Sequence, residues 1–248
     1  MKVSIITVTY NSEATLRDTL ASVQEQSYPN IEHVIVDGAS TDRTLDIVRE
    51  FPVGKLISEP DKGIYDAMNK GLRAATGDII GTLNSDDFYP HKDVVRRVVE
   101  TLLTSGKEAV FGDVKYVDPD DITKVTRHYS SRGFRREKFL KGFMPAHPTF
   151  FTKKAHYEAF GHFKTDYKIA ADYELLLRFL YVNELSFEYI PEVLVKMRAG
   201  GVSNESLKSR VLINKEIVRA CAENGIQTNV FNLSLRYFKK VMELINPA

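Results

Sequence analysis

Short apolar runs rich in β-branched residues alternate with helix-like segments through the first half of the chain. The segment after the first run spaces Leu16, Leu20 and Val23 four and three positions apart, as in a helix with one buried face. Strands and helices that alternate in this way predict parallel βαβ units, with helices on both faces of a sheet. The predicted strands are residues 2–9, 33–37, 55–58, 78–83 and 109–114.

Polar residues follow four of these strands at the point where each strand ends. In an open α/β sheet, ligands bind beyond the carboxyl ends of the parallel strands. The sequence therefore predicts one binding site built from the segments Thr9-Tyr10-Asn11, Asp37-Gly38, Asp61-Lys62-Gly63 and Asn84-Ser85-Asp86-Asp87.

The last of these segments ends the apolar run IIGTL abruptly. Mg²⁺ and Mn²⁺ take oxygen ligands, often one or two carboxylates together with the phosphates of a substrate. The alternative interpretation is an Asx-rich turn that caps the next helix. The sequence on either side favours the cation site.

Length and composition set broad limits on the chain. Its 248 residues, 43% of them apolar, suffice for one large α/β domain, alone or with a small appendage. The formal charge of +1 predicts no nucleic-acid partner, and the single cysteine, Cys221, is expected to be a buried apolar residue. The sequence begins with a predicted strand rather than a signal peptide. It has no apolar run of about 20 residues, so we expect a cytoplasmic protein.

The second half differs in character. It predicts a short strand at 148–152, an amphipathic helix at 172–181, and a strand at 186–197 that Pro191 would place at a sheet edge. Two further helices are predicted near 204–223 and 230–245. The basic, partly aromatic stretch 127–141 suits the cytoplasmic face of an anionic membrane or, equally, a solvated loop.

Several common nucleotide and hydrolase motifs are absent. No G-x-G-x-x-G, G-x-x-x-x-G-K-[ST] or G-x-S-x-G occurs. This disfavours a dinucleotide-binding Rossmann protein, a P-loop ATPase and an α/β-hydrolase. What remains is a nucleotide site made of carboxylates and an aromatic side chain.

The chain resembles the family 2 glycosyltransferases of the GT-A fold. The resemblance rests on VSIITVTYN, HVIVDGASTDRT, SEPDKGIYDAMNKGLRAATGDIIGTLNSDD, HPTFF, YKIAADYELLLRF and GGVS, in that order. It implies a Rossmann-like, mixed but mainly parallel sheet with helices on both faces, plus C-terminal helices. We expect a GT-A domain over 1–203, with a nucleotide-sugar-binding half at 1–115 and an acceptor half at 116–203. A helical extension would then cover 204–248.

The resemblance also assigns residues to the donor. Tyr10 would pack on the nucleobase, with backbone near Val8 and Thr9 at its edge. Asp37 would accept a hydrogen bond from a uracil N–H, and Gly38 would leave room for the ligand. Each has a structural alternative, such as a tyrosine that anchors a turn or an aspartate that starts a helix. Further donor-binding residues are expected to be Asp61, Gly63, Asp66, Asn69, Asn84 and Ser85, although Asp66 and Asn69 also suit a solvated helix face.

Asp86 would bind the Mg²⁺ or Mn²⁺ that bridges the donor phosphates. The family's usual pattern is Asp-x-Asp, and this chain has Asn84 in the first place, so one ligand charge is lost. Asp172 would be the general base, at a helix start where the dipole favours a carboxylate; its alternative is a plain N-cap. His147, Gly201 and Ser203 are assigned to the acceptor or phosphate side, or to ordinary loops.

The implied function is inverting, metal-dependent transfer of a hexosyl or N-acetylhexosaminyl group. The donor would be a UDP-sugar and the acceptor a hydroxyl of a glycan or lipid-linked glycan in bacterial polysaccharide biosynthesis. A non-catalytic GT-A-like module that binds sugar nucleotides or glycans is one alternative. A nucleotidyltransferase is another, disfavoured because TYNSEATL is not a Gly-rich basic loop.

Overall fold

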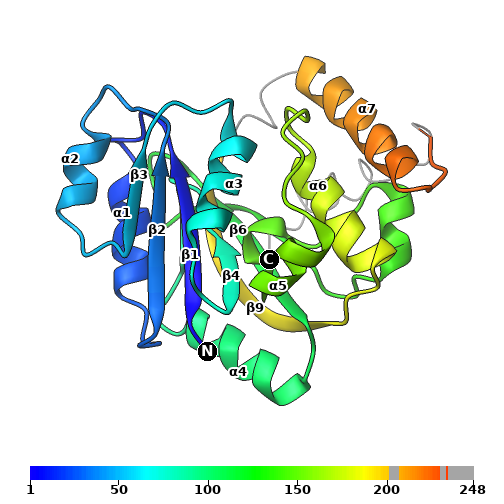
Figure 1. The fold of residues 1–248 in the computed structure, drawn as a ribbon, viewed down its shortest axis with the longest axis horizontal. Coiled ribbons are helices and arrows are strands. Elements are labelled where there is room, and N and C mark those ends of the chain that lie inside the picture. Colours follow the sequence, from blue (N-terminus) through cyan, green and yellow to red (C-terminus); the bar gives the residue numbers. More distant parts are fainter. Residues whose placement is uncertain (201–206, 230–232, 234–248) are drawn as a thin grey trace.

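The computed structural model describes residues 1–200, 207–229 and 233. Strands of this part form a nine-stranded sheet in the order β3-β2-β1-β4-β8-β6-β9-β5, with β7 paired to β6 (Figure 1). The strands are β1 (Val3–Thr9), β2 (Ile31–Asp37), β3 (Lys55–Ser58), β4 (Ile79–Thr82), β5 (Asp87–Phe88), β6 (Ala109–Val117), β7 (Val125–Tyr129), β8 (Phe151–Lys153) and β9 (Phe187–Arg198). The helices are α1 (Leu16–Gln24), α2 (Thr44–Arg49), α3 (Ile64–Ala74), α4 (Val94–Ser105), η1 (Arg136–Lys141), η2 (His147–Thr149), α5 (Lys154–Phe160), α6 (Ala171–Leu176), η3 (Leu177–Val182) and α7 (Leu207–Glu223).

The parallel arrangement predicted for the first half is confirmed. β1 pairs in parallel with β2 on one side and β4 on the other, and β2 pairs in parallel with β3. Thr9 lies opposite Asp37, so β1 and β2 end together. The polar segments that follow the strands therefore start from one edge of the sheet.

Helices cover both faces because alternate residues of a strand point in opposite directions. Ile6 and Val8 belong to a buried cluster with the α3 side chains, whereas Val3 and Ile5 pack with α4. α3 comes close to β1 at Gly71, where an added Cβ would lie 2.4 Å from Cγ2 of Ile6. This close packing fixes the start of α3 beside the strand ends.

The second half makes the sheet mixed. β8 runs antiparallel to β4 and β6, and β9 runs parallel to β6. β9 pairs with β6 along one side, and its other side pairs only with β5, at Lys196 and Met197. Within the described strands, Pro191 therefore lies on a part of β9 that forms the edge of the sheet, as expected. It also falls where the β6–β9 register shifts, between the pairs Phe111–Tyr189 and Asp113–Val193, as a bulge permits.

The predicted amphipathic helix at 172–181 is α6 followed by the π-helix η3. It is buried on nearly all sides rather than on one. Its charged residues are neutralised internally, since Arg178 Nη2 lies 2.8 Å from Oε2 of the fully buried Glu174. Residues 148–152 likewise form a turn of 3₁₀ helix before the short strand β8.

α7 packs beside α6 at the C-terminal end of the described chain (Figure 1). Ile217, Ala220 and Cys221 of α7 join the same buried cluster as α6, which confirms the expectation for Cys221. The helix predicted at 230–245 lies outside the described residues, apart from Leu233. Within the described ranges, no helix is both long and apolar enough to cross a bilayer.

Candidate active site

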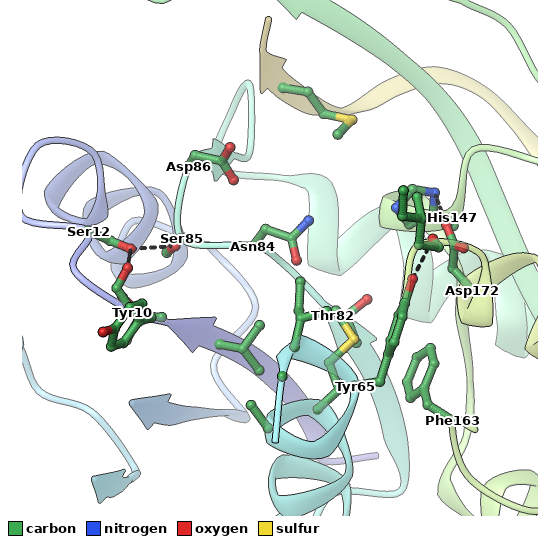
Figure 2. A pocket seen from close by; sticks show the side chains of 18 of the residues that line it. Tyr10, Ser12, Tyr65, Thr82, Asn84, Ser85, Asp86, His147, Phe163 and Asp172 are labelled. Atoms are coloured by element: carbon green, nitrogen blue, oxygen red, sulfur yellow. Dashed lines mark hydrogen bonds and ion pairs between the residues drawn. The ribbon is translucent and has the colours of Figure 1, made fainter. Parts of the chain in front are cut away.

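A cavity of about 690 Å³ opens beyond the carboxyl ends of β1 and β4. The start of α3 forms one wall and the start of α6 another, so the site lies between the two halves of the chain (Figure 2). The predicted site residues that line it are Val8, Thr9, Tyr10, Asp61, Gly63, Asn84, Ser85, Asp86, His147 and Asp172.

Other predicted site residues do not line this cavity. They are Asp37, Gly38, Asp66 and Asn69. Gly201 and Ser203 lie outside the described residues.

Tyr10, Gly38 and Asp61 form the outer end of the site. The Tyr10 side chain is 63% exposed, and Thr9 beside it has a buried hydroxyl with no hydrogen-bond partner among the described residues. Gly38 was expected to leave space for a ligand, but that space holds Asp61: an added Cβ would lie 2.5 Å from its Oδ2. Asp61 Oδ1 also accepts a hydrogen bond from the Gly63 N–H, at 2.8 Å.

Asp37 is fully buried at the end of β2. Its carboxylate accepts hydrogen bonds from the Ser40 N–H at 3.1 Å and from the hydroxyls of Ser40 and Ser58 at 2.5 and 2.7 Å. These bonds fix the backbone next to Gly38. A direct contact between Asp37 and a nucleobase stays a prediction. At this end of the cavity, the carboxylate that lines the wall is that of Asp61.

The α3 side chains Asp66 and Asn69 make hydrogen bonds to neighbouring backbone. The buried Asn69 amide donates to the Phe163 carbonyl at 2.8 Å and accepts from the Phe163 N–H at 3.0 Å. Asp66 accepts from the Lys62 N–H at 3.0 Å. Both side chains thus hold the walls of the cavity, and the donor contact predicted for them is untested.

Asp86 and Asp87 place two carboxylates at the end of β4. Asp86 is half-buried and faces the cavity (Figure 2); burial raises the pKa of its carboxyl, while nearby Arg198 opposes the rise. Burial, reinforced by the Asp86 charge, raises the pKa of Asp87 well above its usual value. Asn84 Nδ2 donates to Asp87 Oδ2 at 3.3 Å, whereas Asp87 Oδ1 has no partner in the described structure. A positive charge near Asp86 and Asp87 would therefore stabilise their ionised forms.

Asp172 lies on the opposite wall, at the start of α6. Its Oδ1 accepts from the Tyr173 N–H at 2.8 Å, and its Oδ2 lies 3.1 Å from Nδ1 of His147 (Figure 2). The Asp172 side chain is 18% exposed, so it is held in place yet open to the cavity. The sequence predicted each residue separately but not this pair, because η2 and α6 meet only in the folded chain.

Many residues of the cavity wall were not predicted, and Arg198 and Tyr65 are two of them whose side chains make hydrogen bonds at the site. Arg198, at the end of β9, donates to the Asp86 carbonyl at 2.7 Å and pairs with Asp18 of α1. Tyr65 of α3 donates to the Ile169 carbonyl at 2.5 Å. Burial, with the Asp172 charge adding to it, raises the pKa of the Tyr65 hydroxyl, which therefore stays a donor. In the sequence, Arg198 is marked only by its position two residues before the Gly200-Gly201 pair of the GGVS motif.

The basic stretch 127–141 packs partly inward. Arg136 donates to the carbonyls of Leu180, Glu184 and Leu185, where it caps η3. The Arg127 guanidinium lies over the ring of Tyr116, 4.8 Å from its centroid. These two cations therefore support the fold, and the membrane contact predicted for the stretch is untested.

Two solved structures share this architecture. Residues 1–349 of S. aureus TarS give a TM-score of 0.65 at 20% identity, over 89% of this chain and 65% of that chain. A mannosyltransferase from Pyrobaculum calidifontis, in complex with GDP-Man and Mn²⁺, gives 0.61 at 23% identity, over 90% and 63%. The predicted GT-A fold is thereby confirmed.

Sequence comparison identifies the family. A model described as Glycosyl transferase family 2 matches residues 4–160. An uncharacterized glycosyltransferase of Mycobacterium tuberculosis is 36% identical over 187 residues, which are 73% of this chain and 70% of that protein. A PGL/p-HBAD biosynthesis glycosyltransferase of Mycobacterium bovis BCG is 30% identical over 223 residues, 87% and 82% of the two chains. The chain belongs to family 2 of the glycosyltransferases, as its motifs indicated.

Proposed function

We propose that this glycosyltransferase moves one sugar from a UDP-sugar, with inversion, to a hydroxyl of a glycan or lipid-linked glycan. One observation carries the proposal. The carboxylates of Asp86 and Asp172 face the same cavity from opposite walls, with room between them for a donor and an acceptor (Figure 2).

The donor would lie along the ends of β1 and β4. Tyr10 offers an exposed ring for a base, and Asp61 offers a polar contact beside it. S. aureus TarS has structures in complex with UDP and with UDP-GlcNAc, and the Pyrobaculum enzyme has one with GDP-Man. These similarities support a nucleotide-sugar donor, and the chain's resemblance to UDP-sugar enzymes favours UDP.

A divalent cation suits the end of β4. Two adjacent carboxylates have raised pKa values, and one buried oxygen of Asp87 lacks a partner, so positive charge there would be stabilising. No set of three or more His, Cys, Asp or Glu side chains in the described structure forms a complete metal site. Asp86 would hold Mg²⁺ or Mn²⁺ together with the donor's phosphates, a common arrangement for these ions. The bound ion would stabilise the negative charge of the departing diphosphate.

Asp172 would act as the general base of the transfer. An acceptor hydroxyl in the cavity gives its proton to the Asp172 carboxylate while its oxygen bonds to the anomeric carbon. The bond from that carbon to the phosphate oxygen breaks, and UDP leaves. Since the base and the diphosphate side are on opposite walls, attack comes from the face opposite the leaving group, which inverts the configuration. His147 keeps the Asp172 carboxylate oriented toward the cavity.

The test combines binding and turnover. Thermal unfolding with UDP-, GDP- and dTDP-sugars, each with Mn²⁺, Mg²⁺ or EDTA, should give a metal-dependent shift for UDP-sugars. Asp86→Ala should abolish this shift. Asp172→Asn should keep it and lower UDP release by a factor of about 10²–10⁴, since it removes only the base. Full turnover by both variants would refute the site assignment.

A binding module without turnover is the second candidate. It is favoured by Asn84, which stands where the family's pattern has a carboxylate. Donor binding with no UDP release under any metal condition would support it.

A further inference from the structure

Glu216 of α7 binds the backbone that leads into α6. Only 6% of Glu216 is exposed, and its Oε1 accepts from the Lys168 N–H at 2.8 Å. Its Oε2 accepts from the N–H groups of Ile169 and Ala170 at 3.0 and 2.9 Å. Three successive amides thus converge on one carboxylate, an arrangement that holds an anion tightly.

The segment 168–170 connects this contact with the cavity. Lys168 and Ile169 line the cavity, and Asp172 follows two residues after Ala170. On the other side, Tyr65 of α3 donates to the Ile169 carbonyl at 2.5 Å (Figure 2). The segment is therefore held by hydrogen bonds to two helices, α7 and α3.

We propose that Glu216 is a positioning residue for transfer: through the amides of residues 168–170, α7 sets the position of the Asp172 carboxylate. The proposal rests on Asp172 acting as the base. A misplacement of about 1 Å in a reacting group lowers rates by about 100-fold, so a modest shift of this segment would be visible in turnover. It gives α7 a role in catalysis without contact to the substrate.

A purely structural role for Glu216 is the alternative, and α7 contains a matched control. Glu223 lies on the same helix and accepts hydrogen bonds from Lys164 Nζ at 2.8 Å and from the Tyr167 hydroxyl at 2.9 Å. Burial is outweighed by these bonds, which lower the pKa of Glu223 to about 2. Glu223→Gln thus weakens the contact of α7 with residues 164 and 167 while leaving the three hydrogen bonds of Glu216 in place.

The experiment compares the intact protein with Glu216→Gln, Glu223→Gln and Asp172→Asn. Glutamine keeps one acceptor and turns an N–H₂ toward the amides. The measurements are UDP release from UDP-GlcNAc and UDP-glucose, UDP affinity by calorimetry, and amide hydrogen exchange. The ¹⁵N signals of the His147 ring report directly on the group that faces Asp172.

We expect Glu216→Gln to lower kcat about 10- to 100-fold, with UDP affinity unchanged. Its amides at 168–170 should exchange faster and the His147 signals should move. Glu223→Gln should change none of these, even where it lowers the melting temperature more. Tyr65→Phe, which frees the same segment from α3, should repeat the loss of kcat and serves if Glu216→Gln does not fold.

Three results would overturn the proposal. One is a kcat for Glu216→Gln equal to that of Glu223→Gln, and another is unchanged exchange at 168–170. The third is Asp172→Asn with full turnover while Glu216→Gln is slow, which would instead show that the base was misassigned. Loss of turnover in Asp172→Asn with normal turnover in Glu216→Gln would leave the proposed function standing and refute the positioning role alone.

Discussion

Substituting Gly38→Ala tests how the outer end of the site is built. The new methyl group would lie 2.5 Å from Asp61 Oδ2 and 3.4 Å from Cδ2 of Tyr10. The first distance is far inside van der Waals contact, whereas the second is ordinary. Asp61 must therefore rotate away, and its bond from the Gly63 N–H, 2.8 Å long, is lost.

The magnitude follows from that single bond. A hydrogen bond to a charged acceptor contributes about 1.5–3 kcal/mol, and since Asp61 is half-buried we expect the loss to be about 1 kcal/mol. For a chain of this length, that lowers the melting temperature by about 2–4 °C. If Asp61 also contacts the donor, UDP affinity should fall about tenfold, which corresponds to about 1.4 kcal/mol.

A double-mutant cycle decides whether the effect runs through Asp61. Titration calorimetry with UDP is done on Gly38→Ala, Asp61→Ala and the double variant. In the Asp61→Ala background, Gly38→Ala should change affinity by no more than about twofold, because the group it displaces is gone. Equal effects of Gly38→Ala in both backgrounds would refute the reasoning, since the methyl group would then act on something else.

Three further predictions follow from buried polar groups. Burial lowers the pKa of His33 from 6.5 to about 3, so the unfolded chain takes up a proton that the folded chain does not. The free energy of unfolding should therefore fall as pH drops from 6.5 toward 3, by up to about 1.4 kcal/mol per pH unit, and urea melts of His33→Gln should lack this share. Asn69→Ala should cost about 2–4 kcal/mol in chemical denaturation because both Phe163 backbone groups lose their partner. Asn84→Asp should lower the melting temperature without metal by about 2–4 °C, since it adds a charge beside Asp87, and should enlarge the shift produced by Mn²⁺ with UDP. Equal melting temperatures without metal would contradict this account of Asn84.

The fold was largely predictable because its first half follows simple periodic rules. Residues 2–9 and 33–37 are rich in β-branched residues and almost entirely buried, as expected of strands covered on both faces, and each ends where a polar segment begins. Local rules failed where long-range packing decides. The register shift between β6 and β9 at Pro191 depends on how two distant strands pair, and the charges of α6 and η3 are buried because Glu174 and Arg178 neutralise each other.

The site was predictable as a set of residues but not as a set of contacts. Asp172 and His147 were each recognisable from their motifs, but their pairing depends on how η2 meets α6. Similarly, the DG pair at the end of β2 indicated a close approach to Gly38, but the chain rather than a ligand supplies the approaching group. Glu216 had no local signal at all, because its partners are backbone amides from a distant segment.

Asn84 shows how such contacts change the meaning of a motif. From the sequence alone, an asparagine in place of the family's first aspartate reads as a lost metal ligand. In the structure it also donates to Asp87 Oδ2, and an aspartate there would instead add a charge beside two carboxylates whose pKa values are already raised. The asparagine thus avoids a third negative charge beside Asp86 and Asp87, and it still lines the cavity. We expect a weaker dependence on metal and a more stable protein without donor to follow from the same substitution, so the two should change together.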